Sequence, residues 1–339
     1  MPITEAVIAV ALAFLIALFG TARMRAFALK AGLIDRPSSR SSHSTPTPRG
    51  GGLAIVAAFL AALLGLYARG YIDARIAAAL IGGGCGIAVV GFVDDRRSVP
   101  ARVRFLVHLG SAALAVGLIG GVPMTPLGHF GEGEIWLSRL IAVVAIAWAI
   151  NLFNFMDGID GIAGAQAVFM SSAGAGLNFY LGGDSSETVA MLCVGSASLG
   201  FLVWNWPPAK IFMGDVGSGF LGFSLAGLGL AASRRNHAAV AVWLILGGVF
   251  LADASVTLAR RMARGDRWFE AHRMHAYQHL ARRWHGHLPV TLVVNAVNVG
   301  WLLPWAICAA AYPTHGAAIV TAALLPLVFV AVIAGAGTP

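Results

Sequence analysis

The stretch NLFNFMDGIDGIAG, residues 151–164, follows an apolar run that is long enough to lie within a membrane. Within ten positions it places four polar side chains, Asn151, Asn154, Asp157 and Asp160. The first three fall within an arc of about 120° on a helix, because successive residues are about 100° apart. Gly158 and Gly161 predict a break that turns the fourth back towards the others. Because polar groups at the end of an apolar helix are costly unless they bind something, we predict a metal and polar-ligand site at the membrane surface. An ordinary interfacial helix end wetted by water is the simpler alternative.

The composition is that of a membrane protein. Of the 339 residues, 58% are hydrophobic and 11% are charged, whereas soluble domains carry about 25% charged residues. The three cysteines all fall in apolar runs and indicate neither a disulfide framework nor a zinc site. The net charge of +8 favours anionic partners and membrane lipid, and gives no indication of nucleic-acid binding.

We predict an all-α, polytopic integral membrane protein, with residues 1–339 forming one transmembrane domain. About eleven membrane helices are expected, or ten if one of the short ones does not span: 4–22, 51–68, 74–93, 103–121, 135–153, 161–181, 188–206, 217–232, 238–259, 288–311 and 315–335. The first lacks a basic leading region and contains Glu5, so we interpret it as an uncleaved span.

The basic residues predict the orientation. Alternate loops and their flanks hold 18 of the 23 lysines and arginines; these loops are 20–50, 94–102, 154–160, 207–216 and 260–287. By the positive-inside rule these loops are cytoplasmic, the N-terminus is outside and the C-terminus is inside. We therefore expect a multi-pass membrane protein whose unusual polar loops, with the predicted site, face the cytoplasm.

The first cytoplasmic loop suits a phosphate group. It reads DRPSSRSSHSTPTPRGGG and offers four cationic or donor side chains, Arg36, Arg40, His43 and Arg49. Arginines beside the backbone N–H groups of a glycine-rich helix start are typical of phosphate sites. An ordinary positive-inside anchor with a flexible turn explains each arginine equally well.

Three further carboxylates occur in two other cytoplasmic loops. Asp94 and Asp95 lie in FVDDRR, and Asp215 lies in KIFMGDVGSGF, where Ser218 is expected to cap the next helix. Adjacent carboxylates favour a bound cation or a nearby arginine. Because the set is made of carboxylate and amide oxygens, we predict Mg²⁺ or Mn²⁺ shared with substrate phosphates.

The last cytoplasmic loop is rich in hydrogen-bond donors. Between 260 and 287 it contains Arg267, His272, Arg273, His275, Tyr277, Gln278 and His279. We expect contacts to pyrophosphate and sugar, in preference to a zinc site on His275 and His279; a basic amphipathic helix is the alternative. In the preceding span, Asp253 is expected to pair with Arg260.

Five motifs in this order resemble the polyprenyl-phosphate N-acetylhexosamine-1-phosphate transferases of glycosyltransferase family 4. They are RSSHSTPTPRGGG, the DD of FVDDRR, NLFNFMDGIDG, FMGDVGSGF and AHRMHAYQHL, and the resemblance covers residues 36–280. The last motif looks most like the branch that initiates bacterial O-antigen or related surface glycans, because the run of adjacent histidines typical of the peptidoglycan branch is absent. Ser98 stands where the family often has a third aspartate, and this puts the role of that carboxylate in doubt here.

The resemblance implies transfer of a sugar 1-phosphate from a UDP-N-acetylaminosugar to undecaprenyl phosphate, with release of UMP. The metal would be held by Asn154 and Asp215, and uracil by Asp160 and Phe212. Catalytic roles would fall to Asp94, which orients or deprotonates the lipid phosphate, and to Asp95 and Asp157. The pyrophosphate and sugar would contact His272, Arg273, His275 and His279, and the lipid phosphate Arg40, His43 and Arg49. Direct attack and a covalent enzyme intermediate are both compatible with these residues, as is a homodimer.

A transporter of an anionic lipid or sugar is the competing class of protein. Transporters place charged residues near the middle of the membrane, often in two repeated halves. In this sequence the acidic residues gather at one membrane face and no repeat is visible, so the transferase is favoured.

The charge asymmetry predicts the accessibility of three loops. Cysteines introduced at Ser38, Ser98 and Arg264 should each react with a membrane-impermeant maleimide only after the cytoplasmic face is opened. Labelling of any of them in intact cells would contradict the predicted orientation and the placement of the site.

Overall fold

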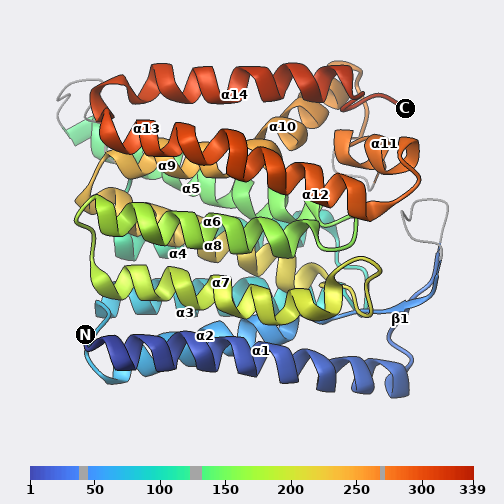
Figure 1. Cartoon of the computed structure of the whole chain (residues 1–339), viewed down its shortest axis with the longest axis horizontal. Coiled ribbons are helices and arrows are strands. Elements are labelled where there is room, and N and C mark those ends of the chain that lie inside the picture. The colour runs from blue at the N-terminus through green and yellow to red at the C-terminus, as the bar shows by residue number, and fades with distance from the viewer. Residues whose placement is uncertain (38–44, 123–131, 268–271) are drawn as a thin grey trace.

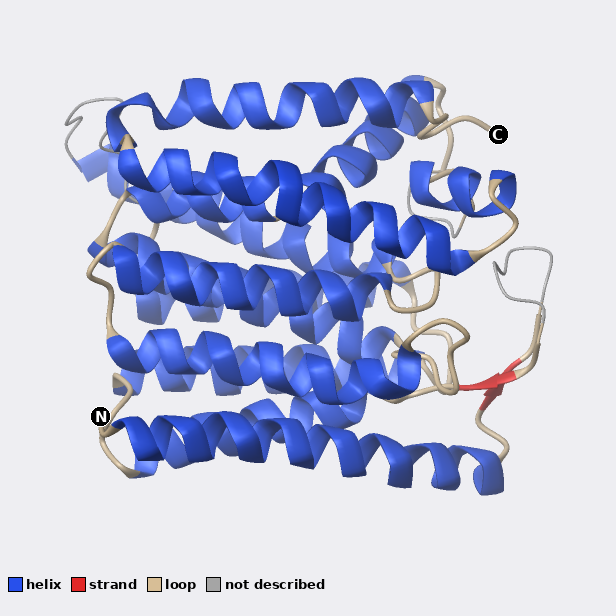
Figure 2. Cartoon of the chain, viewed as in Figure 1, coloured by secondary structure: helices blue, strands red, loops and turns tan. Residues whose placement is uncertain are grey.

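The computed structural model describes residues 1–37, 45–122, 132–267 and 272–339. These residues form a bundle of long helices, and the described part contains one short two-stranded sheet at one end of the bundle (Figure 2). The predicted all-α class is confirmed.

The helices follow one another along the chain with short connections. They are α1 (Ile3–Ala31), α2 (Gly52–Ala68), α3 (Ala74–Asp94), α4 (Ala101–Ile119), α5 (Glu132–Met156), α6 (Ile162–Tyr180), α7 (Ser185–Asn205), α8 (Asp215–Arg235), α9 (Ala238–Leu246), α10 (Gly248–Ala263), α11 (Ala276–Arg283), α12 (His287–Val297), α13 (Leu303–Ala311) and α14 (Gly316–Ile333). A π-helical turn, Asn298–Leu302, joins α12 to α13, and a 3₁₀ turn, Pro313–His315, precedes α14. The strands β1 (Ile34–Asp35) and β2 (Thr47–Pro48) pair antiparallel.

Eight helices in the described ranges are long and apolar enough to cross a membrane, and the bent pair α9 and α10 makes a ninth span if it crosses as one. Helix α2 is apolar but has 17 residues, and α6 packs beside α7 in the same bundle. The protein is therefore a multi-pass membrane protein, while the count of eleven spans stays a prediction.

Helix α1 is longer than expected. It was predicted to end near residue 22, but it continues to Ala31 and ends where Gly32 adopts a left-handed φ of 69°. The bilayer limits the apolar part of a helix, and the following residues, rich in Ala, Arg, Leu and Lys, are good helix formers in water. The first predicted loop therefore begins about ten residues later.

The segment 238–259, expected as one straight span, is broken. Helices α9 and α10 meet at Gly247 with an angle of 72° between them. Two adjacent glycines, Gly247 and Gly248, stand at the break, which is a common cause of a sharp kink. The two glycines therefore account for the bend, although the apolar pattern of the segment does not predict it.

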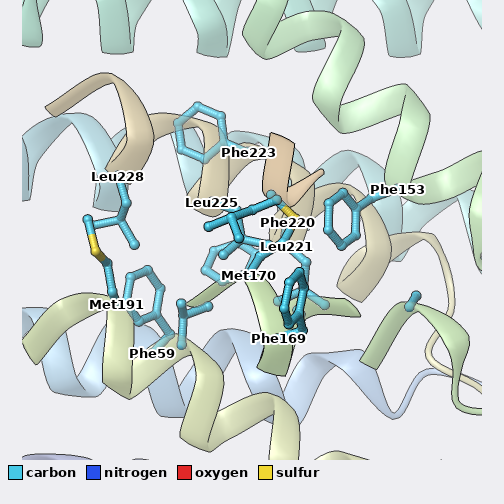
Figure 3. Close-up of a cluster of buried hydrophobic side chains, with 14 of the residues drawn as sticks. Phe59, Phe153, Phe169, Met170, Met191, Phe220, Leu221, Phe223, Leu225 and Leu228 are labelled. Carbon is cyan, nitrogen blue, oxygen red and sulfur yellow. The ribbon is translucent and has the colours of Figure 1, made fainter. Parts of the chain in front are cut away.

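Helix α8 runs through the centre of the bundle and is buried along almost its whole length. It packs against α2, α3, α5 and α7, and its Phe220, Leu221 and Phe223 meet Phe59 and Phe153 in the apolar core shown in Figure 3. The rings of Phe59 and Phe220 lie edge to face with 6.0 Å between their centres. A helix held this way gives its first residue, Asp215, a defined position.

The loops predicted to be cytoplasmic gather at one end of the bundle. The sheet, α11 and the C-terminus lie there, and the N-terminus lies at the opposite end (Figure 1). Within the last loop, 260–287, residues Ala276–Arg283 form the short helix α11.

Candidate active site

The predicted cytoplasmic end contains a polar cavity, which we call the acidic cavity. Six of the predicted site residues line it: Arg49, Asn154, Asp157, Asp160, Phe212 and Asp215. Its volume of about 230 Å³ is close to that of two other cavities, of about 200 and 270 Å³, whose linings are mainly apolar. The lining, and not the size, therefore singles it out as the candidate site.

The break after α5 has the predicted form. Helix α5 ends at Met156, and Gly161 takes a φ of 77° before α6 begins. As a result Asp157 and Asp160 both line the cavity beside Asn154, whereas Asn151 lines a small neighbouring cavity. The turn itself is held from α7, because the Asn205 side chain accepts a hydrogen bond from Gly161 N at 3.0 Å.

Two loops far apart in the sequence are joined by their backbones. Phe212 N donates to Pro48 O (2.8 Å), Gly51 N to Phe212 O (2.9 Å) and Gly52 N to Met213 O (2.9 Å). These bonds bring the 47–52 segment and the start of α8 to one wall of the cavity. Arg49 and Asp215 consequently face each other.

Two arginines bridge three carboxylates. One Arg49 nitrogen, Nη2, lies 2.8 Å from Asp95 Oδ1 and 3.0 Å from Asp215 Oδ1. Nη1 of Arg104 in α4 lies 2.6 Å from Asp94 Oδ2 and 3.3 Å from Asp215 Oδ2. Each oxygen of Asp215 thus meets a different guanidinium group.

Asp95 also holds the start of α8. Its carboxylate accepts hydrogen bonds from Asp215 N (2.9 Å) and Val216 N (3.2 Å), so it occupies the position of an N-cap although it lies on another helix. The predicted cap, Ser218, instead donates to Gly214 O and accepts from the Asn154 amide, so that expectation is wrong. Gly214, with a φ of 78°, leaves no room for a side chain between itself and Asp95.

Burial and charge shift the protonation of this cluster. Burial raises the pKa of Asp157 well above its usual range, and the nearby charge of Asp215 raises it further. Burial also raises the pKa of Asp95, although Arg49 opposes this change. For Arg49, burial lowers the pKa, but the surrounding carboxylates, Asp95 and Asp215 foremost, together raise it above its usual value. These shifts favour the protonated forms of Asp157 and Asp95, which reduces the repulsion among the carboxylates.

The donor set fits a divalent cation that is shared with a substrate. Four carboxylates, Asp94, Asp95, Asp157 and Asp215, face two arginines, which leaves two negative charges if all are ionised. Among the described residues, no three His, Cys, Asp or Glu side chains converge to hold a metal by themselves. Mg²⁺ commonly takes one or two protein oxygens and completes its shell with water and phosphate. Asp215 and Asn154, on one cavity wall, suit that arrangement.

Asp160 is held from three directions. Its carboxylate accepts from Ala209 N (3.0 Å) and lies 3.2 Å from His287 Nδ1, and its carbonyl accepts from the Thr291 hydroxyl (2.9 Å). Phe212 lines the same cavity. A fixed acceptor and an aromatic ring in one cavity suit a planar ligand with N–H donors, as predicted for uracil.

Helix α11 packs on the turn that follows α5. The Tyr277 hydroxyl donates to Phe155 O (2.9 Å), and a side chain at Gly158 would collide with it. Gln278 of α11 lines the acidic cavity. The last loop therefore packs directly on the 151–164 stretch.

Asp253 of α10 anchors α11. Its carboxylate accepts from Ala276 N (2.9 Å), Tyr277 N (3.0 Å) and the Thr257 hydroxyl (3.1 Å), and it lies 3.2 Å from His275 Nδ1. The expected pairing with Arg260 is wrong, because Arg260 donates to the carbonyls of Val332 and Ala336 near the C-terminus. Helical spacing placed Arg260 on the right face, but the buried start of α11 competes for the carboxylate.

The predicted pyrophosphate and sugar residues lie around α11 and do not line the acidic cavity. His275 is 2% exposed and stacks between His272 and Tyr277. Burial lowers the pKa of His272 to about 3, so its imidazole is neutral at pH 7. His279 lies 3.3 Å from Thr338 O, and the Arg273 carbonyl accepts from Arg282. Their contacts with a ligand stay predictions, and the burial of His275 gives it a supporting position.

Arg40 and His43, predicted to bind the lipid phosphate, lie outside the described residues. The structure adds site residues that the sequence did not single out: Asp35, Arg104, Asn205 and His287. Arg104 was counted only among the basic flanks, and its spacing of ten residues from Asp94 across a proline-containing turn offers no periodic signal. The two arginines at the start of α4, in PARVR (residues 100–104), were the only indication.

Comparison with known proteins gives consistent matches. A sequence profile described as Glycosyl transferase family 4 matches residues 77–233, which include Asp94, the 151–164 stretch and Asp215. The chain is 34% identical over 269 residues to the "Probable undecaprenyl-phosphate N-acetylglucosaminyl 1-phosphate transferase" of Bacillus subtilis (strain 168), covering 76% of this chain and 73% of the relative.

Two further relatives extend the match. The "Decaprenyl-phosphate N-acetylglucosaminephosphotransferase" of Mycobacterium tuberculosis (strain ATCC 25618 / H37Rv) is 30% identical over 325 residues, with 87% of this chain and 80% of the relative covered. The "Undecaprenyl-phosphate alpha-N-acetylglucosaminyl 1-phosphate transferase" of Escherichia coli (strain K12) is 28% identical over 273 residues, with 76% and 71% covered.

The anchoring of α11 generates a stability prediction. Asp253→Asn should lower the free energy of unfolding by about 2 kcal/mol, because a buried carboxylate that accepts several hydrogen bonds is replaced by an amide. Asp266→Asn, which loses an exposed pair with Arg264, should change it by less than about 1 kcal/mol. Thermal unfolding of the purified protein in one detergent checks both, and equal melting temperatures would contradict the anchoring role.

Proposed function

Because the chain belongs to glycosyl transferase family 4, we propose that it transfers an N-acetylaminosugar 1-phosphate from a UDP-sugar to undecaprenyl phosphate or a similar polyprenyl phosphate. The products are a polyprenyl-diphosphate sugar and UMP. The observation that carries this proposal is the acidic cavity, in which Arg49, Asn154, Asp160 and Asp215 meet from three segments that are distant in the sequence.

The nucleotide occupies the side of the cavity formed by Asp160 and Phe212. The Asp160 carboxylate, fixed by Ala209 N and His287, accepts the imide N–H of uracil, and the Phe212 ring stacks on the base. The diphosphate then lies towards Asn154 and Asp215. There Mg²⁺ or Mn²⁺ supplies charge neutralisation and polarises the phosphoryl oxygens when it is bound.

The acceptor phosphate approaches from the side of Asp94 and Arg104. One of its oxygens attacks the sugar-bound phosphorus of the donor, the bond from that phosphorus to the bridging oxygen breaks, and the bridging oxygen leaves with UMP. Because two anions must approach each other, Arg49 and Arg104 lower the barrier by opposing the growing charge. Asp94, held by Val99 N at 2.6 Å and by Arg104, orients the acceptor phosphate or takes its proton.

The prenyl tail has an apolar cavity of its own, which we call the apolar cavity. It is lined by α5, α6, α8, α9 and α10, and it follows α5 from Ala142 to Phe153, a length of about 16 Å. Phe153 immediately precedes Asn154 of the acidic cavity. The lipid phosphate and its tail can therefore lie along one helix without crossing the bundle.

The reaction is proposed as the first membrane step of O-antigen or related cell-surface glycan synthesis, at the cytoplasmic face of the bacterial inner membrane. The AHRMHAYQHL loop supports this setting over peptidoglycan lipid synthesis by its lack of adjacent histidines. N-acetylglucosamine, which the printed names of the relatives contain, is the first amino sugar to test.

A direct assay tests the proposed reaction. Purified protein incubated with undecaprenyl phosphate and a panel of radiolabelled UDP-N-acetylaminosugars should release UMP with at least one donor, only when both substrates are present. EDTA should abolish the release and added Mg²⁺ should restore it, whereas a zinc-selective chelator should have no effect. Full activity after exhaustive EDTA treatment would exclude the proposed metal, and no UMP with any donor would exclude the reaction.

Two substitutions separate the acidic residues. Asp215→Asn removes a proposed metal ligand and should weaken UDP-sugar binding in the presence of Mg²⁺. Asp94→Asn should leave that binding nearly intact and lower turnover by about 10²–10⁴-fold, the range typical of a positioned proton acceptor. Calorimetric titration beside initial rates distinguishes them.

Glu5→Gln, at the opposite end of α1, is the matched acid-to-amide control and should behave as the wild type. Near-normal turnover of Asp94→Asn, or unchanged Mg²⁺-dependent binding to Asp215→Asn, would contradict the assignment.

A further inference from the structure

The bend between α9 and α10 is held by two buried amides from other spans. Gln166 Nε2 in α6 donates to Leu246 O, the last carbonyl of α9, at 2.9 Å. Asn298 Nδ2, in the π-helical turn after α12, donates to Gln166 Oε1 at 2.7 Å. The exposed fractions are 1% for Gln166 and 0% for Leu246 and Asn298.

These hydrogen bonds supply a donor to a backbone carbonyl at the bend. A break within a membrane helix leaves backbone carbonyls without their usual intrahelical donors, and the apolar interior offers no water to replace them. The Gln166 amide satisfies one such carbonyl, and Asn298 fixes the orientation of that amide. Three membrane segments are therefore tied together at Leu246.

The bend lies at mid-depth of the apolar cavity. Gly247 lines the cavity, as does Met170, one turn beyond Gln166 on α6. Phe250, just after the bend, packs on Phe153 with 5.2 Å between ring centres, at the end near the acidic cavity. Trp243, before the bend, packs on Gly229 of α8 towards the other end. The angle at Gly247 thus sets how far the two ends of the cavity wall stand apart.

The Asn298 side chain has an unfavourable free-energy contribution from its amide oxygen. Its Oδ1 is buried and has no hydrogen-bond partner within the described chain. A buried amide oxygen without a partner is unfavourable, and leucine would fill a similar volume without that penalty. The favourable contribution of the Asn298 amide is therefore the hydrogen bond that it donates to Gln166.

We infer that Gln166 and Asn298 are positioning residues that hold the α9–α10 bend, and that the bend shapes the apolar cavity for a long prenyl chain. This inference rests on the proposed function, because it concerns the acceptor of that reaction. Neither residue lines the acidic cavity. Their loss should therefore affect recognition of the lipid tail and leave donor binding unchanged.

The test measures how acceptor use depends on chain length. For Gln166→Leu, the KM for undecaprenyl phosphate should rise about tenfold, the effect expected from losing the two hydrogen bonds at the bend. The KM for dimethylallyl phosphate, whose single isoprene unit ends before the bend, should change less than twofold. The KM for the UDP-sugar should also stay within twofold. Asn298→Leu, which keeps the bond to Leu246, should show the same pattern more weakly and serves if Gln166→Leu does not fold.

Asn178→Leu is the matched control. Asn178 is a buried amide on the same helix, 6% exposed, and bonds Asp184 O and Thr188 Oγ1 away from the apolar cavity. It should lower the melting temperature without changing the chain-length preference. If Gln166→Leu and Asn178→Leu lower kcat alike and leave every KM unchanged, the bend has no part in acceptor recognition.

Binding of the two prenyl phosphates to wild-type protein, measured without donor, keeps this inference distinct from the proposed function. Tight, length-dependent binding by the wild type that Gln166→Leu retains would overturn the inference alone. Equal binding of long and short chains by the wild type would overturn the acceptor assignment and, with it, the role of the bend.

Discussion

The bridging of three carboxylates by Arg49 and Arg104 is the interaction on which the site depends. Asp94 ends α3, Asp215 begins α8, and the arginines come from the 47–52 segment and from α4, so the cluster ties four parts of the chain at one end of the bundle. Like charges this close would repel, and the arginines reduce that repulsion without removing it. The remaining negative charge suits the cation and, through it, the phosphate groups that the proposed function requires.

Much of the fold follows from local sequence. Apolar runs of bilayer length located most helices, and basic residues grouped the loops that the structure brings to one end. The errors have a common cause. The continuation of α1 in water, the bend at Gly247 and the true partners of Asp253 depend on helix propensity or on tertiary contacts, which hydropathy does not measure.

The site shows the same division. Asn154, Asp157 and Asp160 were placed together correctly, because a helix face and a glycine turn are local geometry. His287 lines the same cavity, and Arg104 reaches Asp215, only through packing between helices distant in sequence, so no spacing in the chain predicts these two residues. His275 lies in a polar loop and was expected to contact a ligand. Its side chain is instead buried against Asp253 at the start of α11.

The absence of a side chain at Gly158 has an evolutionary consequence. The Tyr277 hydroxyl fills the space over that glycine, so the turn after α5 and the loop before α12 are shaped against each other. A different 260–287 loop, acquired by recombination, would pack poorly on a turn whose shape fits Tyr277. Diversification of this protein should therefore proceed by paired changes in the two segments, inherited together, and not by exchange of the loop as a module.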